Sequence, residues 1–225
     1  MVIGNGLLGN VFSLDCDKYN DFIIFASGVS DSKNTDSNSS NREEELITKT
    51  LLENTGLTFI YFSSILTDTI NNDYYKHKLK MEELVKLKAE KYIIFRIPQI
   101  VGFLGNQNNL FNHLVNNVKT NTSNIVYSNV ERSIVDIDDL KLIVDYCKDK
   151  TINEVINLSY IEKISILDLC NKIYLNFGIE PKITLKINPE NQNWNIDNSK
   201  IIKDALISLK INTLNYTDKI IQKYI

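Results

Sequence analysis

Cysteine and histidine are scarce in this chain, and their scarcity excludes several kinds of chemistry. The 225 residues include only three cysteines, Cys16, Cys147 and Cys170, which are scattered and form no Cys-x-x-Cys pair. Such a set is typical of reduced thiols in a cytosol, and not of a disulfide framework. The two histidines, His77 and His113, are too few and too far apart to indicate a metal centre, so we expect none.

Long hydrophobic runs and an excess of positive charge are also missing. No apolar run approaches the roughly 18 residues of a membrane span, and no charged segment precedes an apolar stretch at the N-terminus. The net charge is −3, whereas a nucleic-acid-binding protein presents a basic face. Lysines cluster between residues 76 and 91, but Glu82, Glu83 and Glu90 lie among them, which indicates a solvated helix face. We therefore expect a cytoplasmic protein that binds neither nucleic acid nor membranes.

Short buried strands alternate with helical segments along the chain. This alternation predicts an α/β fold, with a parallel sheet and helices on both of its faces. A polar loop is expected over residues 27–41, and Glu43, Glu44 and Glu45 are expected in the first turn of the helix that follows it. The expected strands are 1–3, 22–26, 57–63, 92–96, 155–158 and 183–187. A short helix is expected to follow the glycines and to end at about Leu14, and the other expected helices are 41–54, 74–89, 108–119, 137–148, 164–177 and 199–209.

A Gly-x-Gly-x-x-Gly pattern follows the first strand directly and opens the first helix. Its residues are Gly4, Gly6 and Gly9, with Leu7 and Leu8 between the last two glycines. In that context glycines permit a tight turn and close approach to a pyrophosphate at the helix N-terminus. The pattern therefore predicts a dinucleotide site, although an ordinary glycine-rich turn can give the same letters.

The acidic residue that usually follows such a loop by about 20 residues, and binds a ribose hydroxyl, is missing. The stretch before Phe22 is short and polar, with no second strand. The second and third strands of the usual unit are thus reduced or absent, and the choice between NAD and NADP cannot be read from the sequence.

Three polar residues further along suggest acid–base chemistry. Tyr74 and Lys78 are four residues apart at the start of a helix, so their side chains share one face. A phenol has a pKa of about 10 and needs a nearby cation to work near neutral pH. Ser64, which follows Ser63 at a strand end, could hydrogen-bond a substrate carbonyl there. Taken singly, each has a plain alternative, a surface Tyr and Lys or a capped strand end.

Taken together, these motifs resemble the short-chain dehydrogenase/reductase superfamily, and specifically its extended branch, which acts on nucleotide sugars. The resemblance covers nearly the whole chain. It departs from the branch in four ways: the second and third strands are reduced or absent, Ser64 and Tyr74 are close in sequence, Gln99 replaces an Asn, and the substrate annex is small. The matching segments are Gly4–Gly9, Phe25–Gly28, Tyr61–Ser64, Tyr74-x-x-x-Lys78-x-x-x-Glu82, Arg96–Gly102, Arg132–Leu140, Val155–Leu158, Ser165–Leu169 and Asp197–Lys200.

The resemblance implies a Rossmann-like fold with a small C-terminal substrate-binding annex. Residues 1–150 would form the NAD(P)-binding core, with an insertion at about 103–130, and residues 151–225 would form the annex. Ser64, Tyr74 and Lys78 would be the catalytic residues. The resemblance also implies that two copies could form a homodimer through the helix that carries Tyr74 and Lys78. The implied cofactor-binding residues are Gly4, Gly6, Leu7, Leu8, Gly9, Ala26, Ser27, Gly28, Ser63, Lys78, Pro98 and Gln99, and the implied substrate-binding residues are Ser64, Tyr74, Gln99 and Arg132.

Four functions remain open at this point, and the last of them is reduction of a carbonyl that is not on a sugar. The first is NAD(P)-dependent reduction of a 4-keto-6-deoxysugar nucleotide for glycan precursor synthesis, with NADPH preferred and Arg132 binding the diphosphate. The second is epimerisation of a nucleotide sugar by the same site. The third is a non-catalytic dinucleotide-binding module that acts as a sensor or assembly partner.

Overall fold

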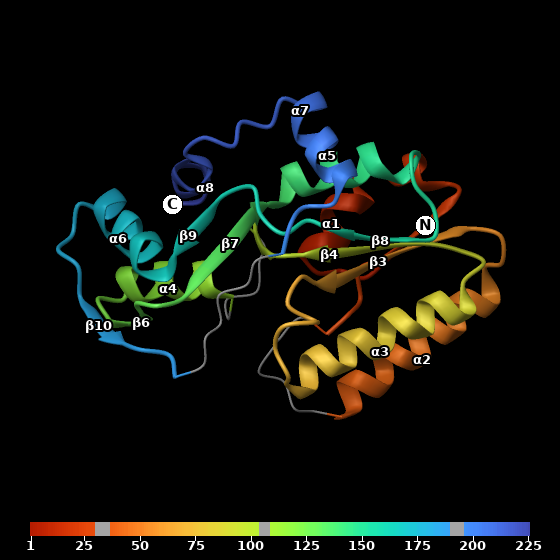
Figure 1. Ribbon diagram of the computed structural model, residues 1–225, viewed down its shortest axis with the longest axis horizontal. Helices are drawn as coiled ribbons and strands as arrows, with labels where there is room; N and C mark the ends of the chain where they lie inside the picture. Colours follow the sequence, from red (N-terminus) through yellow and green to blue (C-terminus); the bar gives the residue numbers. More distant parts are fainter. Residues whose placement is uncertain (30–36, 104–108, 190–195) are drawn as a thin grey trace.

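A five-stranded parallel sheet forms the centre of the larger lobe in a computed structural model of the protein (Figure 1). The structure describes residues 1–29, 37–103, 109–189 and 196–225. The strand order is β1-β2-β3-β4-β8, so β1 lies at one edge. The strands are β1 (Val2–Ile3), β2 (Phe22–Phe25), β3 (Thr58–Ser64), β4 (Lys91–Ile97) and β8 (Glu154–Asn157).

Helices cover both faces of this sheet, as the sequence predicts (Figure 1). One face carries α2 (Ser37–Glu53) and α3 (Asp73–Lys88), and the other carries α1 (Leu7–Ser13), α5 (Ile137–Lys148) and α7 (Lys200–Ser208). A short 3-10 helix spans Cys16–Tyr19 between α1 and β2.

The two-residue period of the strands decides which side chains meet which helices. Phe59 and Tyr61 of β3 pack in the hydrophobic cluster beneath α2 and α3, together with Ile47 and Met81. Their neighbour Phe62 belongs to the cluster on the opposite face. Tyr61 is therefore a buried tyrosine whose hydroxyl lies on the α2 and α3 side of the sheet.

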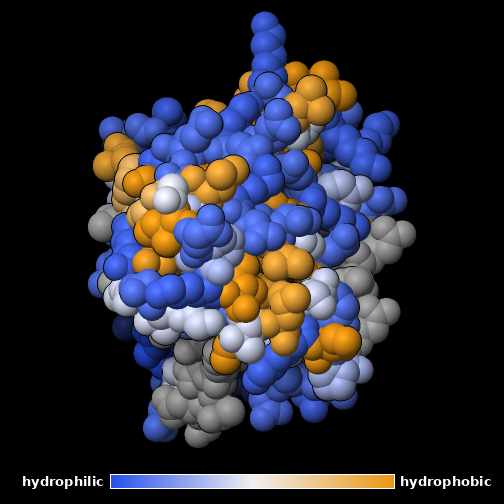
Figure 2. Space-filling view, turned by 90° about the vertical axis from the view of Figure 1, so that its left-hand side faces the viewer, coloured by the Kyte–Doolittle hydropathy of each residue, from blue (hydrophilic) through white to orange (hydrophobic). Residues whose placement is uncertain are grey.

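The smaller lobe lies at the left of Figure 1 and is built mostly from the second half of the chain. A three-stranded sheet has the order β5-β7-β9, and a separate pair joins β10 to β6 in parallel. Figure 2 shows the face at this end, where hydrophobic residues form scattered patches among hydrophilic ones. Its elements are α4 (Leu110–Lys119), α6 (Ile166–Phe177), α8 (Tyr216–Tyr224), β5 (Gln99–Val101), β6 (Asn124–Tyr127), β7 (Glu131–Asp136), β9 (Lys163–Ser165) and β10 (Ile183–Lys186).

The predicted Rossmann-like α/β class is confirmed. Over the described residues β1 is the edge strand, so the two strands that usually continue the sheet beyond it are absent there, as the sequence predicts. The division of the chain at residue 150 stays a prediction, and β8, which follows that boundary, pairs with β4 in the larger sheet. The predicted loop over residues 27–41 and the predicted helix start at residue 108 lie partly outside the described residues. Over the described ranges, no helix combines the length and hydrophobicity needed to cross a membrane.

Helix α2 starts earlier than the sequence predicts, and this changes the position of its glutamates. The helix begins at Ser37 instead of residue 41, so its first turn contains no acidic residue. The prediction that Glu43, Glu44 and Glu45 sit in the first turn is therefore wrong. Glu43 lies further along, on the side that packs against α3, and its side chain is completely buried.

Candidate active site

The three glycines of the first loop have different surroundings. Gly4 has φ +121°, and a Cβ there would lie 2.4 Å from the carbonyl oxygen of Ala26. A Cβ on Gly9 would lie 2.2 Å from the carbonyl oxygen of Gly4. Around Gly6, by contrast, no described heavy atom lies within 4 Å of the place for a Cβ. Two glycines thus allow the backbone to pack closely, and the middle one borders open space.

Helix α1 begins at that open space. Gly6 is its N-cap residue and has no side chain that could cap the amides of the first turn. Leu7 packs close to Gly102, where a Cβ would lie 2.6 Å from Leu7 Cδ1. Leu8 is half-buried one residue further on. Uncapped amides at a helix N-terminus attract anions, so the loop has the shape and polarity to receive a pyrophosphate.

The end of β2 lies beside this loop. The amide of Ala26 donates to the carbonyl oxygen of Ile3, 2.7 Å away, and the carbonyl of Ser27 accepts from Arg42. Gly28 follows, and a Cβ there would lie 2.7 Å from Lys78 Nζ. This predicted cofactor segment is therefore in contact with the predicted catalytic lysine, which the sequence places 50 residues later.

Ser63 and Ser64 end β3 at the same edge of the sheet. Ser64 is half-buried, and its Oγ accepts a hydrogen bond from the amide of Leu66 at 3.3 Å. The Oγ of Ser63 is buried and has no hydrogen-bond partner among the described residues. Ile65 and Leu66, which follow the pair, pack with Tyr74, and this contact brings the serine segment close to the start of α3.

Tyr74 and Lys78 share one side of α3, as their spacing predicts. Asn72 caps the helix, with its side chain accepting from the amide of Tyr75 at 3.0 Å. Lys78 Nζ lies 5.9 Å from the centre of the Tyr74 ring. Tyr74 is half-buried, whereas burial of the neighbouring Tyr75 raises the pKa of the Tyr75 phenol. Of the two tyrosines, Tyr74 is therefore better suited to exchange a proton with a ligand.

The Lys78 side chain is buried, with only 3% of the residue exposed, so it is not part of the solvated lysine face expected for this helix. Its ammonium donates to Glu43 Oε1 at 3.1 Å and to the hydroxyl of Tyr61 at 3.1 Å. The Tyr61 hydroxyl donates in turn to Glu43 Oε1 at 2.7 Å. Lysine carries three N–H donors, so within the described part of the chain one remains beyond these two bonds.

Glu43 accepts from four groups at once. Besides Lys78 and Tyr61, the amide of Val29 donates to its Oε2 at 2.7 Å, and His77 Nε2 lies 3.0 Å from the same oxygen. Burial alone would raise the pKa of this carboxyl, but the charge of Lys78 and the hydrogen bonds outweigh it and lower the pKa to about 2. Glu43 is therefore ionised at neutral pH and forms a buried ion pair with Lys78.

Sequence reasoning missed Glu43, Tyr61 and His77 as part of this site. The one local signal was His77, which directly precedes the lysine of the Tyr-x-x-x-Lys pattern. Glu43 lies 35 residues before Lys78, and only the packing of α2 against α3 brings the two together.

The remaining predicted residues surround the same end of the sheet. Pro98 separates β4 from β5, and Gln99 begins β5, with its Oε1 buried and without a hydrogen-bond partner in the described part of the chain. Arg132 lies in β7, where burial lowers the pKa of its guanidinium and the nearby Tyr75 partly counteracts this. Its Nη1 donates to the carbonyl of Glu131 at 2.7 Å.

A second ion-pair group supports the segment between Ser64 and Tyr74. Arg96 of β4 binds the completely buried Glu82 of α3, with Nη2 2.8 Å from Oε2. The same guanidinium also contacts Asp68, which lies in the connecting segment. Arg96 and Glu82, part of the resemblance above, thus hold α3 against β4 and fix the loop that leads to Tyr74.

Comparison of the sequence with protein-family models and with curated proteins finds no match. Solved structures are similar throughout the chain. A UDP-glucuronic acid 4-epimerase from Bacillus cereus, in complex with UDP-glucuronic acid and NAD, has a TM-score of 0.68 at 16% identity, over 98% of this chain and 80% of that one.

Two further structures match equally well. RMD from Pseudomonas aeruginosa, complexed with NADPH, has a TM-score of 0.70 at 13% identity, over 98% of this chain and 86% of that chain. A dTDP-glucose 4,6-dehydratase from Bacillus anthracis, in complex with NAD, has a TM-score of 0.67 at 13% identity, over 98% and 77%. The chain shares their fold. The resemblance inferred from the motifs is thus confirmed for the architecture, while the roles of single residues stay predictions.

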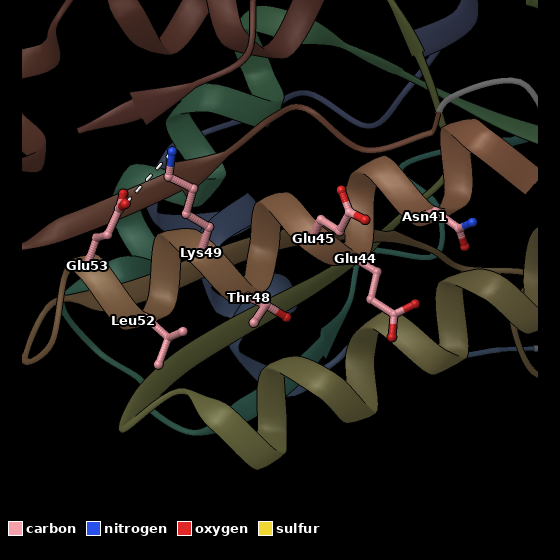
Figure 3. Close-up of a pocket in the computed structure, with 7 residues that line it drawn as sticks. All are labelled: Asn41, Glu44, Glu45, Thr48, Lys49, Leu52 and Glu53. Carbon is pink, nitrogen blue, oxygen red and sulfur yellow. Dashed lines mark ion pairs between the residues drawn. The ribbon is translucent and has the colours of Figure 1, made fainter.

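A hollow of about 520 Å³ lies apart from these residues, along the exposed side of α2 (Figure 3). Lys49 and Glu53 form an ion pair across part of it, at 3.8 Å. None of the predicted site residues lines it, so it adds nothing to the candidate site. Its lining residues are Asn41, Glu44, Glu45, Thr48, Lys49, Leu52 and Glu53.

Proposed function

We propose that this protein is an NAD(P)-dependent oxidoreductase that acts on a nucleotide-linked sugar and reduces a 4-keto-6-deoxysugar. The observation that carries the proposal is the juxtaposition of an uncapped glycine loop with a Tyr74–Lys78 pair at the carboxyl edge of a parallel sheet. The similarity to structures that hold NAD, NADPH and UDP-sugars supports it.

The residues fit a nicotinamide dinucleotide. The open space at Gly6 and the uncapped amides of α1 would receive the pyrophosphate, and the ends of β2, β3 and β4 would flank the nicotinamide half. The proposed contacts are those predicted from sequence, with NADPH preferred over NADH. When bound, the reduced dinucleotide supplies a hydride to the carbonyl carbon of the substrate.

Side chains of the protein would bind the carbonyl oxygen of the substrate and supply the proton that it takes up. Ser64 would hydrogen-bond the substrate carbonyl, and Tyr74 would donate a proton to its oxygen as the carbon is reduced. The free N–H of Lys78 would bind a ribose hydroxyl of the cofactor. Gln99 would contact the sugar, and Arg132 would bind the diphosphate with its planar guanidinium. We further propose a cytoplasmic location, and a homodimer through the α3 side.

Epimerisation is the second candidate, because one of the similar structures is a UDP-glucuronic acid 4-epimerase bound to its substrate and NAD. An epimerase oxidises the sugar and then reduces it, so the bound dinucleotide is regenerated in each cycle. A net consumption of reduced dinucleotide therefore separates the two functions.

The test is an assay of NADPH and NADH oxidation with a panel of nucleotide-linked 4-keto-6-deoxysugars. We expect at least one ketosugar to consume the reduced dinucleotide. Tyr74→Phe should lower that rate about 100-fold or more, because it removes the proton donor. The control is Tyr75→Phe, which removes the hydroxyl of the adjacent buried tyrosine and should leave the rate within about twofold of wild type.

Two other outcomes would contradict the proposal. If the protein binds dinucleotide but no ketosugar consumes it, the reductase assignment fails, and epimerisation and then a sensor function should be tested. If Tyr74→Phe turns over as fast as the wild type, the assigned acid is wrong.

A further inference from the structure

The ammonium of Lys78 forms an ion pair with a carboxylate of the protein itself. Glu43 and Lys78 are both almost completely buried, and their Oε1 and Nζ atoms are 3.1 Å apart. The hydroxyl of Tyr61 lies within hydrogen-bond distance of both atoms, which fixes the pair in one place. A buried carboxylate at this distance cancels most of the field that the lysine would otherwise produce around it.

Other charged groups also lie on α3 or against it. Glu82, one turn after Lys78, is paired with Arg96 from β4. His77 lies on the Glu43 oxygen that does not contact Lys78, and Arg132 from β7 lies towards Tyr75. Among the described residues, Glu43 is the acidic group that forms an ion pair with the Lys78 ammonium.

This balance bears on Tyr74, whose ring centre is 5.9 Å from Lys78 Nζ. An unpaired cation beside a phenol stabilises the phenolate and makes the phenol a better base after it has lost its proton. A cation whose charge is cancelled leaves the phenol protonated. Reactions that begin by oxidising a sugar hydroxyl need a tyrosinate base, whereas reduction of a carbonyl needs a protonated tyrosine.

We propose that Glu43 is a positioning residue that holds Lys78 in place and cancels its charge, so that Tyr74 remains a proton donor and the site is biased towards reduction. This inference rests on the proposed function, because it assumes that Tyr74 is the group that exchanges the proton. In this proposal, the site prefers reduction to the sugar oxidation that begins an epimerase or dehydratase reaction. The residue that causes this preference is a carboxylate on α2, and it is not one of Ser64, Tyr74 and Lys78.

Gly28 is part of the same arrangement. A Cβ at this position would lie 2.7 Å from Lys78 Nζ and 2.8 Å from Glu43 Oε1. The absence of a side chain lets the ion pair lie directly against the end of β2, where the cofactor is proposed to bind. The amide of the next residue, Val29, then donates to Glu43 and closes the pair on that side.

The test is a titration of Tyr74 in the protein without cofactor or substrate. Tyrosines labelled with carbon-13 at the hydroxyl-bearing carbon are followed by NMR from neutral to alkaline pH, and the Tyr74 signal is the one missing in Tyr74→Phe. In Glu43→Gln, which leaves Lys78 unpaired, we expect the Tyr74 phenol to titrate about one pH unit lower than in the wild type. An unchanged or higher titration point would overturn the proposal.

The matched control is Glu44→Gln, which removes the same charge from the next position of α2. Glu44 pairs with Lys80 of α3 at 2.6 Å, but that pair is solvent-exposed, so its loss should leave the Tyr74 titration unchanged. A shift in this control as large as in Glu43→Gln would show a general effect of helix charge and would overturn the proposal.

A second variant keeps the test decisive if Glu43→Gln does not fold. Glu43→Gln/Lys78→Met removes both buried charges together, a replacement that cores often tolerate. If Glu43 cancels the charge of Lys78 in the wild type, removing both should leave the titration point of Tyr74 within about half a pH unit of its wild-type value. If the charge of Lys78 is not cancelled, its loss should raise the titration point of Tyr74 by about one pH unit. Because the titration needs no turnover, its failure is separate from a failure to find a ketosugar substrate.

Discussion

Gly4, Gly6 and Gly9 belong to one short loop, yet they would respond differently to the same substitution. Gly4 and Gly9 have backbone carbonyl oxygens at less than 2.5 Å from the place for a Cβ, and Gly4 also has a positive φ. Gly6 has φ −80° and open space around it. Gly4 and Gly9 allow α1 to pack closely on the sheet, and Gly6 borders the space where we propose that the pyrophosphate binds.

Gly6→Ala should therefore separate ligand binding from folding. We expect its melting temperature to stay within about 2 °C of the wild type, because alanine fits the backbone and touches no described atom. Its affinity for NADPH should fall about tenfold or more, because the methyl group enters the space proposed for the pyrophosphate. Fluorescence titration with the reduced dinucleotide measures the affinity, and calorimetry the melting.

Gly9→Ala is the matched comparison. Its Cβ would lie 2.2 Å from the Gly4 carbonyl oxygen, so backbone must move and the free energy of unfolding should fall by about 2 kcal/mol. If Gly6→Ala binds NADPH as tightly as the wild type, the glycine loop is not the pyrophosphate site.

The residues of the site were predictable only where their chemistry is local. The spacing of Tyr74 and Lys78 on one helix, and the strand-end position of Ser64, could be read from the sequence and agree with the geometry of α3 and β3. Glu43 could not, because an acid near a helix start is normally exposed and favoured by the helix dipole. Its burial follows from an earlier helix start and from the docking of α2 on α3.

The Glu43 carboxylate contributes to the contact between α2 and α3, and this has a consequence for stability in acid. The pKa of Glu43 in the folded protein is about 2, below its ordinary value of 4.5, although burial alone would raise it. A group whose pKa is lowered by folding stabilises the fold above its unfolded pKa and loses that contribution as the pH falls through its folded pKa.

We therefore expect the free energy of unfolding to fall by about 3 kcal/mol between roughly pH 4.5 and pH 2 because of Glu43 alone. Urea unfolding at a series of pH values measures this decline. Glu43→Gln should lose stability near neutral pH and show a shallower acid dependence, while Glu44→Gln should follow the wild type. Parallel curves for the wild type and Glu43→Gln would rule out the paired carboxylate.

Secondary structure was most predictable where the chain is buried on both sides of a sheet. Apolar runs predict β2, β3 and β4, and hydrophobic periodicity predicts α3 and α5. The predicted bounds agree with the observed ones to within a few residues. The predictions missed β5, β6, β7, β9 and α8, because three- to six-residue strands in a polar sequence carry little pattern of their own.

Helix α8 shows why such elements need the whole structure. It is short, and its contacts are with a distant segment: the hydroxyl of Tyr216 donates to Asp139 at 2.7 Å, and Lys223 binds Asp136 at 2.7 Å. Tyr224 adds a hydrogen bond to the same Asp136. These partners lie 77 to 88 residues away in sequence, beyond the reach of any local pattern.

At the scale of the whole molecule, the sheet order places β1 at an edge. In a complete dinucleotide-binding unit, two more strands continue the sheet beyond the first one, and a residue there recognises the adenosine ribose. In the described residues β1 pairs with β2 alone, so the two halves of the proposed cofactor site are unequal. The nicotinamide half would lie at the ends of β2, β3 and β4, whereas no described strand lies beside the proposed adenosine half.

This asymmetry predicts weak discrimination between the two dinucleotides. Selection normally comes from an acid that binds the ribose 2′-hydroxyl, or from an arginine that binds the 2′-phosphate. We expect the dissociation constants of NADPH and NADH to differ by about tenfold or less, with NADPH the tighter ligand. A difference of about 1000-fold, measured by the same fluorescence titration, would show that a selective adenosine site exists.

The central claim, that Tyr74 and Lys78 serve a net reduction of a nucleotide-linked ketosugar, is tested most directly by isotope transfer. The protein is incubated with a 4-keto-6-deoxysugar nucleotide and NADPH that carries deuterium at the transferring position, and the sugar product is analysed by mass spectrometry. We predict one deuterium per product molecule, bound to the former carbonyl carbon, with one oxidised dinucleotide formed for each, and almost no product with Tyr74→Phe. A sugar product without deuterium, or an unchanged dinucleotide beside an epimerised sugar, would contradict the account.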